Sequence, residues 1–193
     1  MRRTASRKQL LITTLAILLF LAVLFLFVAH VSHEHRRRQR ENAVYSMVLT
    51  AAGTFGVSPA MVLAVIRTES DFHPNAYSAA GAVGLMQILP ETFLYLREEK
   101  LNEKLSEQDL WEPEVNIRYG TYYLSYLFSR FGSWQVALAA YNAGEGRVEK
   151  WLKDSALSDG VHLLDIPYPE TKQYVAVTME AYREYLEKYN FKE

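Results

Sequence analysis

Glu69 is the side chain in this sequence whose neighbours best suit proton-transfer chemistry. It closes an apolar segment that begins at Ser58-Pro59, a pair typical of a helix N-cap and first helical residue. Val65 and Ile66 precede Glu69 by four and three positions, so in a helix all three share one face. A carboxyl held against an apolar face loses hydration, which raises its pKa and keeps it protonated near neutral pH. Glu69 is therefore a candidate general acid.

A second carboxylate is the usual partner of such an acid, because glycosidases place two carboxyl groups about 5 to 9.5 Å apart. Asp71 lies two residues beyond Glu69 and would point away from it on a continued helix. The other acidic candidates stand at expected helix starts, where a negative charge stabilises the helix dipole without a catalytic role: Glu91, Glu145 and Glu170. The sequence therefore predicts a site built on one carboxylate.

A glycine-rich turn after Glu69 carries three further candidate groups. Gly84 allows a backbone with positive φ and the close approach of a ligand. Met86 suits either the core or an apolar wall of a cleft. Gln87 offers both hydrogen-bond donors and an acceptor to a polar ligand.

Four segments of the chain, in order, resemble the motifs of lytic transglycosylases related to the soluble Slt type, which are similar in fold to goose-type lysozyme. They are Glu69-Ser70, Gly-Ala-Val-Gly-Leu-Met-Gln at 81–87, Ala-Ala-Tyr-Asn-Ala-Gly at 139–144, and Pro-Tyr-Pro-Glu-Thr-Lys-Gln-Tyr-Val at 167–175. The resemblance extends over residues 45–190 and implies an all-α, lysozyme-like domain that cleaves peptidoglycan.

The resemblance also implies a mechanism and a set of site residues. Glu69 would protonate the bond between N-acetylmuramic acid and N-acetylglucosamine, with help from the substrate's acetamido oxygen, and would then act as base on the muramyl 6-hydroxyl. The product is a 1,6-anhydromuramyl end, formed without water, metal or other cofactor. Ser70 and Tyr174 would orient the acid. The residues expected to bind the glycan are Gly84, Met86, Gln87, Tyr141 and Asn142.

Two alternatives remain open at this point. A hydrolytic muramidase would use the same acid but admit water, and its product would be heavier by one water. An inactive glycan-binding scaffold of the envelope is the other alternative, and its expected signature is a replaced acid. Glu69 is present, so the sequence favours an enzyme.

Helical periodicity and helix-terminal residues divide the soluble part into helices. The expected helices are 42–54, 59–69, a segment opened by Pro90 that runs through Leu96, 113–131, 134–141, 146–152, and a last helix that starts near Pro169 and continues through Tyr185. Residues 154–160 are expected to form a loop, and no segment has the alternation typical of a strand. The predicted fold class is therefore all-α.

Residues 10–29 form an uncharged, apolar run of the length that a helix needs to cross a bilayer. This run is longer than the apolar core of a usual signal peptide, and no good cleavage site follows it. The sequence predicts a cytoplasmic N-terminal tail at 1–9, a transmembrane anchor at 10–30, a basic juxtamembrane linker at 31–41 and the catalytic domain at 42–193. Flanking charges do not decide the orientation, but a peptidoglycan substrate would place the domain outside a single-pass cytoplasmic-membrane anchor.

Composition excludes several other classes. The chain has no cysteine, so disulfides and thiolate chemistry are excluded. A net charge of −1 argues against a nucleic-acid binder. His30, His33 and His35 lie beside arginines and are typical of a solvated linker near lipid headgroups rather than of a metal site. The sequence names no protein partner.

Overall fold

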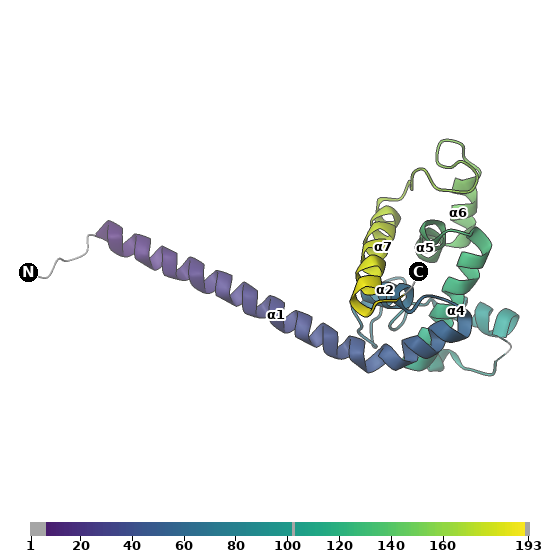
Figure 1. Ribbon diagram of the computed structural model, residues 1–193, viewed down its shortest axis with the longest axis horizontal. Coiled ribbons are helices and arrows are strands. Elements are labelled where there is room, and N and C mark those ends of the chain that lie inside the picture. Colours follow the sequence, from purple (N-terminus) through teal and green to yellow (C-terminus); the bar gives the residue numbers. More distant parts are fainter. Residues whose placement is uncertain (1–6, 102, 192–193) are drawn as a thin grey trace, which may run out of the picture. The chain divides into compact units, whose positions relative to one another are not determined.

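The computed structural model describes residues 7–101 and 103–191, and these ranges contain helices, turns and isolated bridges but no extended strand (Figure 1). This confirms the predicted all-α class. The elements are α1 (Arg7–Phe55), α2 (Pro59–Ser70), α3 (Pro90–Leu96), a π-helical turn η1 (Arg97–Leu101), a 3-10 helix η2 (Glu107–Trp111), α4 (Pro113–Phe131), α5 (Trp134–Ala143), α6 (Glu145–Leu152) and α7 (Pro169–Tyr189).

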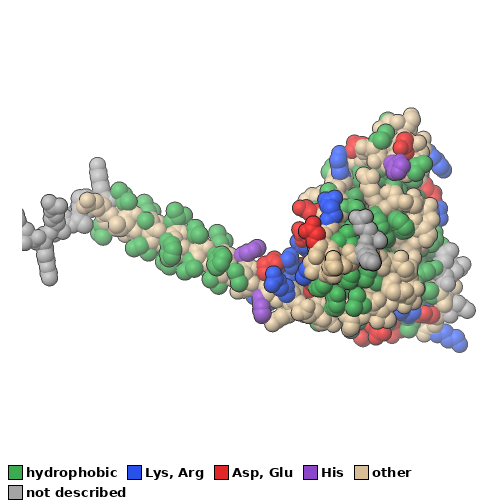
Figure 2. Space-filling view, in the orientation of Figure 1, with side chains coloured by type: hydrophobic (Ala, Val, Ile, Leu, Met, Phe, Trp, Pro, Cys, Tyr) green, Lys and Arg blue, Asp and Glu red, His purple; other side chains and the backbone are tan. Residues whose placement is uncertain are grey.

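The chain divides into two compact units, Met1–Arg40 and Glu41–Glu193, and α1 contributes to both. Within the described residues, α1 is the one helix long and apolar enough to cross a membrane, and no part of its most apolar stretch is buried in the protein. Figure 2 shows these hydrophobic side chains exposed along the helix. Exposed apolar area on this scale is unfavourable in water, so the stretch suits a lipid environment. The transmembrane anchor stays a prediction.

The predicted linker continues α1 as helix, with an ion pair of 2.5 Å between Glu34 and Arg37. Its last residue, Glu41, belongs to the second unit and is only 2% exposed. The Glu41 carboxylate lies 2.5 Å from Nζ of Lys188 and accepts hydrogen bonds from the hydroxyls of Tyr185, at 3.2 Å, and Tyr189. Glu41, which the sequence predicted to lie in the linker, thus packs within the second unit.

Two apolar helices form the centre of the second unit. Residues 60–66 of α2 and 136–140 of α5 are all fully buried, as expected for helices that are apolar on every face. The longest helix of this unit, α7, packs on both α2 and α5, and α4 packs on α5 (Figure 1). The prediction that α5 is central is confirmed.

The end of α2 is set by two consecutive residues in the left-handed conformation, Asp71 with φ 47° and Phe72 with φ 62°. This conformation is unfavourable for residues other than glycine and stops the helix. Burial of the Phe72 ring, which is 0% exposed, holds the turn in place. Because the helix does not continue, Glu69 and Ser70 lie in its last turn. At the other end Pro59 opens α2 as predicted, but the Ser58 side chain makes no capping hydrogen bond.

Candidate active site

A cleft of about 460 Å³ in the second unit has Glu69 in its wall. Of the predicted site residues, Glu69, Gln87, Tyr141 and Asn142 line it. The other lining residues come from the loop before α3, from α3, and from α4 to α7: Ser78, Ala80, Ala82, Ile88, Leu89, Glu91, Thr92, Tyr123, Ala143, Gly144, Arg147 and Glu170.

Glu69 is crowded by protein yet keeps partial exposure toward the cleft. Burial raises the pKa of its carboxyl from 4.5 to about 7, and the hydroxyl of Tyr174 partly offsets this rise. The expectation that Glu69 has an elevated pKa is thus supported by its surroundings. A group with a pKa near neutral pH can donate a proton and later accept one.

Two tyrosines from different helices flank this carboxyl. The pKa values of both Tyr174, on α7, and Tyr141, on α5, are raised by burial first and then by the negative charge of Glu69. The hydroxyl of Tyr141 donates to the backbone oxygen of Met86 at 2.7 Å. The hydroxyl of Tyr174 is buried and has no hydrogen-bond partner of standard geometry among the described residues. It is therefore close enough to influence the acid but is not bound to it tightly.

Ser70, which the sequence predicted to orient the acid, does not bond to the carboxyl of Glu69. Its hydroxyl donates to the backbone oxygens of Leu85, at 2.8 Å, and Ile66, at 3.1 Å. Ser70 thus ties the end of α2 to the glycine-rich loop. Any orienting effect on Glu69 is indirect.

The expectation that Gly84 and Met86 contact the substrate needs correction, because both are buried and neither lines the cleft. Gly84 has φ 78°, and a Cβ built there would lie 2.3 Å from Nδ2 of Asn116. The Met86 side chain is 0% exposed and fills the space over Gly120, where an added Cβ would lie 2.4 Å from its sulfur. The loop can therefore pack against α4 only with no side chain at position 84, and Met86 fills the space that Gly120 leaves on α4.

Gln87 lines the cleft with part of its hydrogen-bonding capacity already used. Its side-chain nitrogen donates to the backbone oxygens of Gly84, at 2.8 Å, and Ala76, at 3.2 Å. Since both N–H groups have partners, the side-chain oxygen is the group left for a ligand. The sequence had suggested both donor and acceptor functions.

Asn142 differs from Gln87 in which end of its side-chain amide is left for a ligand. Its side-chain oxygen accepts a hydrogen bond of 2.7 Å from the hydroxyl of Thr171, which is buried in the first turn of α7. Asn142 itself is exposed in the cleft, and its amide N–H groups are the donors left for a ligand.

Four charged or aromatic residues in the cleft were not chosen from the sequence. Glu91 and Glu170 do lie in the first turns of α3 and α7 as expected, but they also line the cleft. Glu170 lies inside the 167–175 motif, so its position in the sequence could have identified it as a residue of the site. No sequence motif points to Tyr123 or Arg147, which also line the cleft. The ring centroid of Tyr123 lies 5.4 Å from that of Tyr141.

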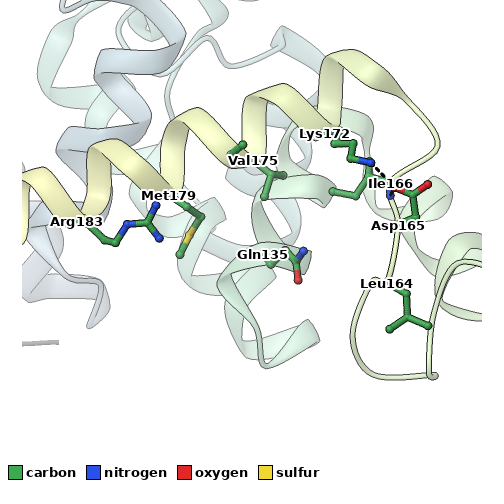
Figure 3. A pocket seen from close by; sticks show the side chains of 9 residues that line it. Gln135, Leu164, Asp165, Ile166, Lys172, Val175, Met179 and Arg183 are labelled. Atoms are coloured by element: carbon green, nitrogen blue, oxygen red, sulfur yellow. Dashed lines mark hydrogen bonds and ion pairs between the residues drawn. The ribbon is translucent and has the colours of Figure 1, made fainter.

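A second cavity, of about 430 Å³, lies on another face of α7 and shares no lining residue with the cleft (Figure 3). Its rim carries an ion pair of 2.6 Å between Lys172 and Asp165, and Met179 and Val175 lie along its wall. It contains none of the predicted site residues. In the part of the chain that the structure describes, no group of three or more His, Cys, Asp or Glu side chains is suited to hold a metal ion.

Comparisons with known proteins agree with this geometry. Residues 46–162 match the model of the transglycosylase SLT domain family. The chain is 42% identical over 123 residues to the soluble lytic murein transglycosylase of Salmonella typhimurium, a match that covers 62% of this chain and 19% of the relative. It is 31% identical over 153 residues to membrane-bound lytic murein transglycosylase C of Histophilus somni, covering 72% of this chain and 42% of the relative.

Solved structures show the same similarity. An inactive glutamate-to-glutamine variant of the lytic transglycosylase Slt from Pseudomonas aeruginosa superposes with a TM-score of 0.68 at 38% identity, over 75% of this chain and 24% of that one. The 70 kDa soluble lytic transglycosylase of Escherichia coli superposes with a TM-score of 0.65 at 32% identity, over 74% of this chain and 24% of that one. The chain thus spans about a fifth to a quarter of the length of these soluble relatives.

Proposed function

The chain belongs to the transglycosylase SLT domain family, and from this premise we propose that it is a peptidoglycan lytic transglycosylase with Glu69 as its single catalytic acid and base. The observation that carries the proposal is the state of Glu69. Glu69 lies in the last turn of the buried helix α2, and its carboxyl is in the wall of the cleft. Burial raises the pKa of this carboxyl to about 7.

The proposed reaction has two steps. The protonated Glu69 gives its proton to the glycosidic oxygen between N-acetylmuramic acid and N-acetylglucosamine, the bond to the muramyl anomeric carbon breaks, and the acetamido oxygen stabilises that carbon. The ionised Glu69 then takes the proton of the muramyl 6-hydroxyl as that oxygen bonds to the anomeric carbon. A 1,6-anhydro end forms, no water is consumed, and Glu69 regains its proton.

The polar groups left over in the cleft suit an N-acetylated glycan. Gln87 offers a carbonyl oxygen to substrate N–H or O–H groups, and Asn142 offers N–H donors to substrate carbonyl or hydroxyl oxygens. Tyr141 forms part of the wall. The hydroxyl of Tyr174, which lowers the pKa of the Glu69 carboxyl, assists by donating a hydrogen bond to that carboxyl in its ionised form.

The relatives support this proposal. One solved relative is an inactive variant produced by a single glutamate-to-glutamine change, as expected for chemistry that rests on one carboxyl group. A membrane-bound relative and the apolar stretch of α1 support a single-pass anchor at residues 10–30, with the domain at 42–193 on the extracytoplasmic side where peptidoglycan lies. Fractionation tests the anchor: the full chain should stay with membranes in high salt.

A hydrolytic muramidase is the second candidate, and one observation favours it. Glu91 and Glu170 also line the cleft, so a second carboxylate is present that could activate water. The two reactions differ by one water in the mass of the product.

Digestion of peptidoglycan tests the proposal. The full chain, purified in detergent, is incubated with sacculi, and the released fragments are weighed by mass spectrometry. We expect anhydro-ended fragments and none from the Glu69→Gln protein. Fragments heavier by one water would identify the hydrolase, and no release by the wild type would favour a glycan-binding scaffold.

A further inference from the structure

Asn116, on α4, is a buried amide with every hydrogen-bonding group occupied. It is 1% exposed, and its Nδ2 donates to the backbone oxygens of Val83, at 2.9 Å, and Leu110, at 3.0 Å. Its Oδ1 accepts from the backbone nitrogen of Met86 at 2.8 Å. The absence of a side chain at Gly84 gives the amide its space. Asn116 thus holds the loop of residues 83–86 at two points and joins it to η2.

The same loop is bonded from two other helices at adjacent peptide groups. Ser70, from the last turn of α2, donates to the oxygen of Leu85, and Tyr141, from α5, donates to the oxygen of Met86. Asn116 adds the bond from α4. The peptide groups of Leu85 and Met86 are therefore the point where α2, α4 and α5 are fixed relative to one another.

We propose that Asn116 is a positioning residue for the reaction: it fixes the loop that holds the end of α2, and so the carboxyl of Glu69, against the two flanking tyrosines. This inference rests on the proposed function for its catalytic meaning. Asn116 does not line the cleft, so its effect passes through Leu85 and Met86.

Physical reasons make this amide hard to replace. Loss of the side-chain amide leaves the backbone oxygen of Leu110 and the backbone N–H of Met86 buried without partners, which is unfavourable. The oxygen of Val83 loses one of its two bonds and keeps the one from the N–H of Ile88, at 3.0 Å. Positive φ values also occur within the loop at Gly84, 78°, and directly after it at Gln87, 47°, and such conformations persist only where the surrounding structure imposes them. We expect the loop to relax when Asn116 is removed, and Tyr141 to move with it.

Movement of the loop would change the surroundings of Glu69. The ionisable groups around that carboxyl are Tyr174 from α7 and Tyr141 from α5. The other ionisable residues that line the cleft are Glu91 from α3, Tyr123 from α4, Arg147 from α6 and Glu170 from α7. A shift in the pKa of Glu69 is therefore a direct readout of its position.

The test compares two replacements of polar by apolar side chains of similar shape on α4, Asn116→Leu and the control Thr121→Val. Thr121 is also fully buried, but its hydroxyl has no hydrogen-bond partner among the described residues. The full chain in detergent micelles is used for thermal unfolding, for kcat and KM on soluble glycan chains, and for ¹³C NMR titration of labelled glutamate carboxyls. The Glu69 signal is assigned by its loss in Glu69→Gln.

We expect Asn116→Leu to lower kcat by about 10- to 100-fold, the scale of a misplaced catalytic group, to change KM much less, and to shift the pKa of Glu69. Thr121→Val should leave kcat, KM and the pKa of Glu69 unchanged. A wild-type kcat and Glu69 pKa in folded Asn116→Leu would overturn the proposal.

If Asn116→Leu does not fold, Ser70→Ala is the deciding variant, since it cuts the link from α2 to the loop and, besides that link, only a bond within α2 to the oxygen of Ile66. It must then lower kcat and shift the pKa of Glu69, and wild-type values for both would reject the proposal. The NMR titration needs no substrate, so it decides the positional inference even if the wild-type chain proves inactive on glycan.

Discussion

The hydroxyl of Thr171 donates a hydrogen bond of 2.7 Å to the side-chain oxygen of Asn142, which joins the end of α5 to the first turn of α7. This bond fixes which end of the Asn142 amide is left for a ligand. Thr171→Val removes the bond at nearly constant shape. A neutral hydrogen bond contributes about 0.5 to 1.5 kcal/mol, so KM for glycan chains should rise by about 2- to 10-fold with kcat nearly unchanged.

The control for this prediction is Thr178→Val on the same helix. Thr178 is also buried, but its hydroxyl bonds to Thr68 and interacts with the hydroxyl of Tyr174, and neither of these residues lines the cleft. Its replacement should affect thermal stability and leave KM as in the wild type. Equal KM values in the two variants would mean that the orientation of Asn142 does not matter for binding.

Glu69→Gln should abolish cleavage while the fold stays intact, because the amide has the same shape but cannot deliver a proton. General acid–base assistance is commonly worth about 10² to 10⁴-fold, and the loss should lie at the upper end if no other carboxyl substitutes. Release of fragments from sacculi measures it. Glu91→Gln and Glu170→Gln should each retain far more activity, and a comparable loss in either would indicate a second catalytic carboxylate.

Stability should depend on pH through Glu69. Its pKa is raised from 4.5 to about 7 in the folded chain, so between these values the folded state holds a proton that the unfolded state has released. The free energy of unfolding contributed by this group is therefore fully present below about pH 4.5 and is lost as the pH rises through about 7. Denaturant titrations should show that the free energy of unfolding falls more between pH 5 and pH 8 in the wild type than in Glu69→Gln. Parallel pH dependences in the two proteins would contradict the raised pKa.

Tyr174→Phe should slow turnover with little change in stability. A hydrogen bond to a charged group contributes about 1.5 to 3 kcal/mol, so loss of the hydroxyl should lower kcat by about 10- to 100-fold. Because the hydroxyl lowers the pKa of Glu69, the pKa measured from the alkaline side of the rate profile should rise. Tyr182 on the same helix is equally buried, at 8% exposed, and Tyr182→Phe should keep wild-type kinetics. Small, equal effects at both positions would make Tyr174 a packing residue.

Glu41→Gln should destabilise the second unit. The buried carboxylate has Lys188 and two tyrosine hydroxyls as partners, and charge-assisted bonds of this kind are worth about 1.5 to 3 kcal/mol. Since Lys188 is partly exposed, the loss should be near the lower value. Glu34→Gln, on the same helix, breaks the Glu34–Arg37 pair and the longer contact of 3.8 Å between Glu34 and His33, and it should change the free energy of unfolding by less than about 0.5 kcal/mol. A Glu41→Gln protein as stable as the wild type would show that the contact is dispensable.

Local features of the sequence were sufficient to predict the α-helices of the second unit, but not η1, η2 or the continuation of α1 through residues 31–41. Pro113 and Gly132 bound α4 as expected, with Gly132 in the left-handed conformation at φ 68°, because both residues act through their own backbone. The expected neighbours of Glu69 were also local, since Val65 and Ile66 lie one turn before it on the same helix. Periodicity alone thus predicted a crowded carboxyl.

Which side chains meet in the cleft was decided by tertiary packing. The loop packs on α4 through residues 30 or more positions apart in the sequence, namely Gly84 and Met86 against Asn116. No local pattern tells whether a residue in a turn faces the core or a ligand. Glu91 and Glu170 have the same local signature as any acid in a first helical turn, and only the packing of α3 and α7 beside the cleft makes them site residues. The crowding of the Glu69 carboxyl could be foreseen because Val65 and Ile66 lie on its own helix, whereas the groups around it in the cleft depend on contacts between helices that are distant in the sequence.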